Sequence, residues 1–181
     1  MLAVAPPEGN DRPVRFRAIF EAELDYVWTS LRRLGVQTRD LEDVTQEVFV
    51  HVYARLDVYD PARPIRPWLF AFAARCASDW RRLARHRVEV LGVVAEPQSA
   101  TPGADHELDR QRDLMLVLNA LEHVDIERRP VFILHDLDDC PMREITQVLG
   151  IPLFTGYSRL RLARQEFTTA VRRLRPAWER A

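Results

Sequence analysis

Residues 130–173 read PVFILHDLDDCPMREITQVLGIPLFTGYSRLRLARQEFTTAVRR, and this stretch decides the expected fold. An apolar helix runs into a short acidic turn, and a second helix begins near Pro141 and ends at Gly150-Ile151-Pro152. A third helix follows, whose buried stripe is Leu160, Ala163 and Phe167. Two short helices joined by a tight turn that contains glycine are typical of a helix-turn-helix, whose last helix enters a DNA major groove. The stretch therefore predicts DNA binding.

The composition is that of a globular protein. The chain has 181 residues and 47% hydrophobic residues, enough for a core. It contains no run of about eighteen apolar residues, so we expect no membrane insertion. Residues 1–10 have no cationic segment ahead of apolar residues, so we expect no signal peptide. Cys76 and Cys140 are far apart without a CxxC partner and are interpreted as reduced thiols of a cytoplasmic protein.

Charge is segregated along the chain although the net charge is only −1. Every cationic side chain other than histidine is arginine, and arginines dominate residues 63–87 and 155–175. The compensating acids lie in residues 40–47 and 89–109. This pattern indicates two cationic surfaces and an acidic one, each with its own partner; the alternative is a set of solvated helix faces.

Helical periodicity divides the chain into two parts. Apolar residues recur at helical spacing in 16–34, 41–56 and 67–86, and no alternating pattern predicts a strand. Periodicity resumes at Leu108. The predicted fold class is all-α: an N-terminal extension at 1–15, a helical domain at 16–87, a flexible acidic linker at 88–107 and a helix-turn-helix domain at 108–176.

Two further helices carry residues that favour a binding function. The helix at 67–86 interleaves aromatic side chains with arginines, which suits stacking on unpaired bases, although such aromatics are equally typical of a core. Asp40, Asp43 and Glu47 share a helix face opposite the apolar stripe, and a protein-docking surface is the economical interpretation. The acids, His135 and Cys140 within 135–140 lack zinc-like spacing, so we expect no metal site. No phosphate loop or nucleophile motif occurs, so we expect no cofactor and no catalytic residue.

These motifs together resemble bacterial RNA polymerase sigma factors of the extracytoplasmic-function (ECF) type, over about residues 16–175. DLEDVTQEVF at 40–49 is similar to the family's polymerase-binding helix, and RPWLFAFAARCASDWRR at 66–82 to the helix that melts and reads the −10 promoter element. GIPLFTGYSRLRLAR at 150–164 is similar to the helix that reads the −35 element. The resemblance implies a transcription initiation factor whose partners are core polymerase (the β′ clamp and the β flap), promoter DNA and an anti-sigma factor.

The resemblance also implies roles for individual residues. Polymerase binding is expected of Asp40, Leu41, Asp43, Gln46 and Glu47. Contacts with the −10 element are expected of Arg66, Trp68, Arg75, Asp79, Trp80, Arg81 and Arg82. Contacts with the −35 element are expected of Thr155, Tyr157, Ser158, Arg159, Arg161 and Arg164.

The sequence departs from the family pattern in the recognition helix. Phe154 stands where a small or polar residue is usual, Gly156 where an aliphatic one is usual, and Tyr157 where a basic one is common. A glycine inside a helix costs about 1 kcal/mol relative to alanine, so a loosened helix is expected. Two alternatives stay open: a free-standing helix-turn-helix regulator, and a sigma-like decoy that binds polymerase without reading a promoter.

Overall fold

The computed structural model describes the backbone of residues 11–91 and 105–178 and the side chains of residues 11–84 and 112–175. Within these ranges the regular structure is helical and contains no strand, which confirms the all-α prediction. The α-helices are α1 Arg12–Arg33, α2 Leu41–Arg55, α3 Ile65–Leu91, α4 Asp105–Glu122, α5 Arg129–Phe132, α6 Met142–Leu149 and α7 Leu153–Trp178. Short 3-10 helices at Thr38–Asp40 and Leu56–Val58 flank α2, and a π-helical turn, Ile133–Leu137, continues α5.

The first helix begins earlier than the sequence predicted. Pro13 occupies its first turn, where a missing backbone N–H costs nothing. Residues 12–15 are therefore helical, which corrects the predicted extension at 1–15, and residues 1–10 lie outside the described ranges. The helix ends as expected, because Gly35 follows with a φ of +89°, a conformation that suits glycine after a helix C-cap.

Both ends of the predicted linker are helical. α3 starts at Ile65, has Pro67 in its first turn and continues to Leu91, while α4 begins at Asp105. Residues 88–91 and 105–107 therefore belong to helices, and residues 92–104 lie outside the described ranges. Asp40 stands at the N-cap of α2, a position that favours aspartate, but its side chain makes no capping hydrogen bond.

The helix-turn-helix is formed by α6 and α7. Pro141, in an extended conformation, is the N-cap of α6, and Gly150 ends this helix with a φ of 66°. Asp139 reaches a φ of 52° in the acidic turn before α6, a conformation that aspartate tolerates better than most residues. Ile145 is fully buried, and Leu160 and Ala163 of α7 are buried against it, as the periodicity predicted.

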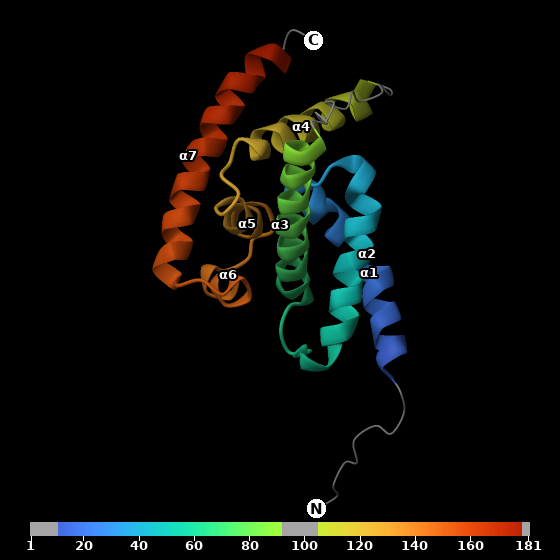
Figure 1. The fold of residues 1–181 in the computed structure, drawn as a ribbon. Coiled ribbons are helices and arrows are strands. Elements are labelled where there is room, and N and C mark those ends of the chain that lie inside the picture. Colours follow the sequence, from blue (N-terminus) through green and yellow to red (C-terminus); the bar gives the residue numbers. More distant parts are fainter. Residues whose placement is uncertain (1–10, 92–104, 179–181) are drawn as a thin grey trace, which may run out of the picture.

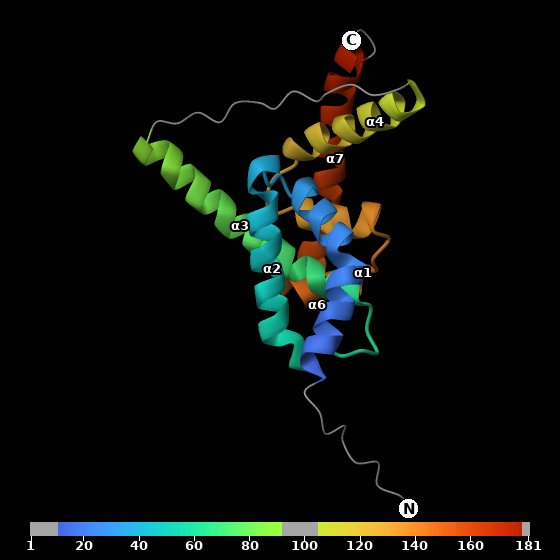
Figure 2. The same cartoon turned by 90° about the vertical axis from the view of Figure 1, so that its right-hand side faces the viewer.

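The helices pack around α3, which lies between α1 and α2 on one side and α5 to α7 on the other (Figure 1). A view turned by 90° shows that the last turns of α3 project away from this assembly (Figure 2). Buried residues from both halves of the chain, such as Phe70 of α3 and Ile145 of α6, belong to one continuous hydrophobic core. Each such side chain contributes about 1.5–3 kcal/mol through burial. Leu83 shares a helical stripe with Leu69 and Cys76, which predicts burial, but it is 56% exposed.

Candidate functional site

The acidic face of α2 is exposed over a rigid base. Asp43, Gln46 and Glu47 are exposed, while Val44 and Val48 are buried beneath them. Asp40 is half-buried and lies 3.6 Å from the guanidinium of Arg39. These side chains are available to a protein partner without rearrangement of the helix.

Leu41 requires a correction. Its side chain is completely buried, so in this structure it supports the acidic face instead of contributing to it. Val50 shows the opposite error: it is 62% exposed on α2, one turn beyond Glu47, and sequence reasoning passed over it. The sequence could have revealed this exposure, because Val50 lies outside the apolar stripe formed by residues 41, 44, 48 and 52. A valine outside the buried stripe adds apolar area to a polar surface.

The aromatic residues at the start of α3 form a packed row. Trp68 is half-buried, with ring centroids 4.9 Å from both Tyr59 and Phe72. Phe72 is buried, and the exposed guanidinium of Arg75 lies 5.5 Å from its ring centroid. The row is therefore fixed by a tilted contact between Tyr59 and Trp68 and an edge-to-face contact between Trp68 and Phe72, and Trp68 is its partly accessible member.

The charged residues predicted for this helix differ in how they are held. Arg66 donates to Glu23 at 2.9 Å, and Arg82 donates to Asp79 at 3.1 Å; both arginines are exposed. Trp80 is half-buried and packs against the core. Arg81 is half-buried and donates to the carbonyl of Leu34 at 2.8 Å. Arg81 therefore lies at a contact between helices here, which sequence periodicity could not reveal.

The first turns of α7 carry the six residues predicted to contact DNA, and their environments vary. Tyr157 and Arg161 are exposed, while Thr155 and Ser158 are half-buried. Arg159 donates to Glu127 at 2.6 Å. Arg164 makes two hydrogen bonds of 2.7 Å to Asp136. These bonds from Arg164 are the main reason that the pKa of the Asp136 carboxyl lies below its usual value.

Gly156 has a packing role that its sequence position concealed. It is buried where α7 crosses α6, and a Cβ atom added there would lie 2.7 Å from Met142 Sδ and 2.8 Å from Thr146 Cγ2. The aliphatic residue expected at this position would fit only if Met142 and Thr146 moved. The glycine therefore permits close helix packing, and its propensity cost is offset by this contact.

Exposed apolar residues begin the same helix. Phe154 is 84% exposed and Leu153 is 43% exposed. Arg143 of α6 is also exposed on the helix-turn-helix. None of these was among the predicted contact residues. The sequence did single out Phe154, because a small or polar residue is usual at this position in the family.

Comparisons with known proteins agree with this division into two helical regions. The family model for Sigma-70 region 2 matches residues 19–87, and the model for Sigma-70, region 4 matches residues 114–167. The chain is 32% identical over 151 residues to the ECF RNA polymerase sigma factor SigL of Mycobacterium tuberculosis, covering 81% of this chain and 83% of that protein. The chain belongs to the ECF sigma factors. It is therefore a transcription initiation factor.

Other relatives of this sigma factor support the same assignment. It is 28% identical over 148 residues to the RNA polymerase sigma factor CnrH of Cupriavidus metallidurans, covering 76% of each chain. The solved structure of CnrH with the cytosolic domain of CnrY matches with a TM-score of 0.59 and 26% identity, covering 89% of this chain and 88% of that one. The sigma factor RpoE with the anti-sigma factor NepR, from Bartonella quintana, shares the fold with a TM-score of 0.69 and 20% identity, covering 87% and 97%.

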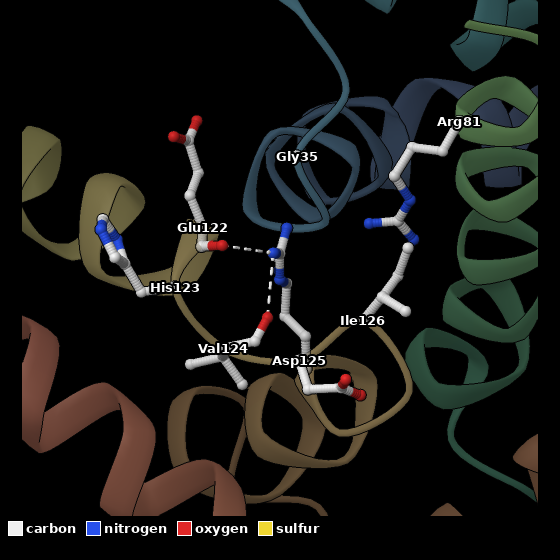
Figure 3. Close-up of a pocket in the computed structure, with 8 residues that line it drawn as sticks. Gly35, Arg81, Glu122, His123, Val124, Asp125 and Ile126 are labelled. Carbon is white, nitrogen blue, oxygen red and sulfur yellow. Dashed lines mark hydrogen bonds between the residues drawn. The ribbon is translucent and has the colours of Figure 1, made fainter. Parts of the chain in front are cut away.

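In this sigma factor the two regions meet at the loop after α1. Arg129 is 7% exposed and donates to the carbonyls of Leu34, Glu122 and Val124 at 3.0–3.1 Å. Arg81 donates to the same Leu34 carbonyl from α3. Figure 3 shows Gly35, Arg81 and Glu122 around this junction, which borders an open pocket of about 460 Å³. Burial lowers the pKa of Arg129, yet guanidinium remains charged in proteins.

A second contact joins the regions through Asp138. Its carboxylate accepts hydrogen bonds from the Tyr26 hydroxyl at 2.8 Å and from Arg33 at 2.9 Å. Burial, with the Asp138 charge as a further cause, raises the pKa of Tyr26 well above its ordinary value. The acidic turn that sequence reasoning considered as a metal cluster is thus occupied by ion pairs, because His135 and Arg164 also contact Asp136.

The two cysteines are free and buried, as predicted. Burial raises the pKa of Cys76 and of Cys140 to about 12, with nearby carboxylates adding to the effect. Both are therefore protonated at neutral pH in the absence of a cation. In the described part of the chain, no helix combines the length and apolar character that a membrane span requires.

Proposed function

We propose that this sigma factor docks on core polymerase through the α2 face formed by Asp40, Asp43, Gln46, Glu47 and Val50. The observation that carries the proposal is the exposure of four of these side chains above buried Val44 and Val48: Asp43, Gln46, Glu47 and Val50. Exposed carboxylates around an apolar residue suit a partner that offers arginines or lysines and an apolar contact. By the family resemblance, the partner surface is the β′ clamp, with the β flap as a second contact.

We further propose that the two regions divide promoter recognition. Arg66, Trp68, Arg75, Asp79, Trp80 and Arg82 of α3 would engage the −10 element, where a partly exposed tryptophan can stack on an unpaired base. Thr155, Tyr157, Ser158, Arg159, Arg161 and Arg164 would engage the −35 duplex. Exposed Phe154 adds an apolar surface that suits a thymine methyl group.

This division requires the two regions to separate. The elements lie about 25 base pairs apart, which is about 85 Å of DNA, whereas a compact chain of this length has a radius of gyration of about 16 Å. The packed arrangement therefore cannot reach both elements at the same time. The contacts that Leu34 and Asp138 make between the two regions must break when promoter is bound. Arg81 would then become available to the −10 element.

The protein is proposed to act in the cytoplasm without catalytic activity, the polymerase supplying the chemistry. An anti-sigma factor is the proposed regulator, because the sigma factors of the two solved structures described above are each in complex with a partner, CnrY or NepR. The packed form is the proposed target, since it brings both regions within reach of one partner.

The test is run-off transcription with purified bacterial core polymerase on a pool of promoter fragments, with and without the full chain. Discrete chain-dependent transcripts are expected. Glu47→Arg should abolish them together with co-elution on core polymerase, while Glu21→Arg, at an exposed site on α1, should preserve both. Co-elution without transcripts would favour the decoy function. Duplex binding without any polymerase association would overturn the proposal in favour of a free-standing regulator.

A further inference from the structure

A group of potential metal ligands lies between α2 and α3, apart from the acidic turn considered from the sequence. One ligand atom each from Glu47, His51 and Cys76 falls within 4.8 Å of the others. Glu47 and His51 are separated by one helical turn, and their Oε1 and Nε2 atoms are 3.8 Å apart. Cys76 approaches from the neighbouring helix. Among the residues that the structure describes, no second group of three histidine, cysteine or acidic side chains brings its ligand atoms this close together.

We propose that Glu47, His51 and Cys76 bind a divalent transition-metal ion of the zinc class. Thiolate sulfur, imidazole nitrogen and carboxylate oxygen are the donors that Zn²⁺ takes in proteins. Two ligands four residues apart on one helix face recur in zinc sites, because this spacing directs both side chains to the same point. A hard ion such as Mg²⁺ or Ca²⁺ prefers oxygen ligands and is disfavoured by the sulfur.

The geometry needs only small adjustments. Bond lengths of about 2.0–2.3 Å in a tetrahedral site place donor atoms about 3.3–3.6 Å apart, so the group must contract by about 1 Å. Glu47 and His51 can move, because their side chains are 52% and 55% exposed. Cys76 is 3% exposed and is fixed by the packing of α3. The exposed side of the site leaves a fourth position for water.

The surrounding charge favours a cation. The carboxylates of Glu47 and Asp79 are both close enough to act on the charge of the Cys76 thiol, with Arg75 as the opposing charge. Asp79 is itself paired with Arg82 on α3. Binding would release the thiol proton to solvent as the metal–sulfur bond forms, with no change in oxidation state.

Metal binding would have a consequence for docking, which rests on the proposed function. Glu47 belongs to the α2 face proposed to contact core polymerase, and its carboxylate cannot both ligate a metal and pair with a basic residue of the polymerase. Because the thiol proton leaves as the divalent ion binds, the site gains one net positive charge on an acidic surface. Occupancy is therefore expected to weaken association with core polymerase.

The direct test is titration of the reduced full chain with Co²⁺, followed by competition with Zn²⁺. A tetrahedral cobalt–thiolate absorption at one ion per chain, removed by Zn²⁺, is expected. His51→Ala, an exposed position, should weaken binding by more than about tenfold without affecting folding. Cys76→Ala should remove the cobalt–sulfur band. Cys140→Ala is the matched control, because Cys140 is also buried but its sulfur contacts Glu144 without a histidine.

Absence of the cobalt–sulfur band, or its loss in Cys140→Ala but not in Cys76→Ala, would overturn the metal site. The docking consequence is tested by measuring core polymerase binding with and without Zn²⁺. A loss of affinity in the unaltered chain but not in His51→Ala is expected. Equal affinity at saturating Zn²⁺ would overturn the consequence. Failure of the metal-free chain to bind polymerase would overturn the proposed function instead, and the cobalt spectrum would stand.

Discussion

Region 2, residues 19–87, and region 4, residues 114–167, hold their charged side chains in different ways. On α2 of region 2, the carboxylates of Asp43 and Glu47 are exposed above a buried apolar stripe. In region 4, Arg159 pairs with Glu127 and Arg164 pairs with Asp136, so two of the three arginines predicted to contact the −35 element are bound within the region.

This difference shows that position on a helix face is a reliable guide only where a side chain has no internal partner. An exposed carboxylate on α2 can bind a partner directly. A paired arginine of α7 must first exchange its carboxylate partner for a DNA phosphate. The net gain in binding free energy is then the difference between two similar ionic contacts. The α2 face of region 2 is therefore preformed. Arg159 and Arg164 of region 4 depend on exchange, as do the paired Arg66 and Arg82 of α3.

The largest expected effect tests the contact between the regions. Arg129→Met keeps the apolar stem but removes the donors to three carbonyls, those of Leu34, Glu122 and Val124. The Leu34 carbonyl keeps its hydrogen bond from Arg81, but the carbonyls of Glu122 and Val124 lose the donor that Arg129 supplies. Unsatisfied buried acceptors cost about 1–3 kcal/mol each, so we expect a loss of about 3 kcal/mol. Urea unfolding measures the loss, and small-angle scattering should show a larger radius.

Arg128→Met is the matched control for this substitution. Arg128 is the neighbouring arginine and contacts Glu166 within region 4 at a partly exposed site. Its removal should cost less than about 1 kcal/mol. Equal losses in the two variants would show that the junction is not a principal source of stability.

The next effect concerns the packing of region 4 alone. Gly156→Val would place its side chain against Met142 and Thr146, and overpacking of this kind costs about 1–3 kcal/mol. We expect thermal unfolding to show a loss of about 2 kcal/mol. Gln165→Val adds the same side chain at an exposed position of α7 and should change stability by less than about 0.5 kcal/mol.

A smaller effect compares one buried thiol in each region. The pKa of Cys76 and of Cys140 is about 12 in the folded chain against 9.0 unfolded, so above pH 9 the unfolded chain loses these protons first. The contribution of these thiols to the free energy of unfolding is therefore fully present below pH 9 and is lost as pH rises toward 12. The slope for one group is less than about 1.4 kcal/mol per pH unit.

Urea titrations from pH 8 to 11 measure this slope. Cys76→Ala and Cys140→Ala should each make it shallower, and the double variant should retain the part due to Tyr26, whose pKa is also raised. An unchanged slope in both single variants would show that other groups cause the alkaline loss.

The smallest effect distinguishes two arginines of α7. Arg161 is exposed, so Arg161→Ala should reduce promoter affinity and lower the salt dependence of binding by about one unit. Arg164→Ala removes the two bonds to Asp136, so it should reduce stability while changing the salt dependence less. Titration of promoter fragments with the polymerase complex at several salt concentrations measures both. Identical slopes would show that the internal ion pair opens freely on DNA.

The sequence alone determined the helices, the turn at Gly150 and the family. Apolar spacing, proline in first turns and glycine at helix ends act over a few residues, so local pattern suffices to reveal them. The α2 face could be predicted for the same reason, since one amphipathic helix separates its buried and exposed residues by itself. The contact role expected of Leu41 came from the family resemblance, whereas its place in the apolar stripe agrees with its burial. The error at Leu83 arose because its exposure depends on neighbours from other helices.

Only the tertiary structure decided which side chains from distant parts of the chain meet. The fit of Gly156 against α6, the pairing of Arg164 with Asp136 and the burial of Arg129 beside Leu34 all depend on helix packing. The same holds for Cys76, which joins Glu47 and His51 only because α2 and α3 are adjacent. Hydrogen bonds and metal coordination depend on distances of a few ångströms, and periodicity along the sequence carries no information about distances between helices.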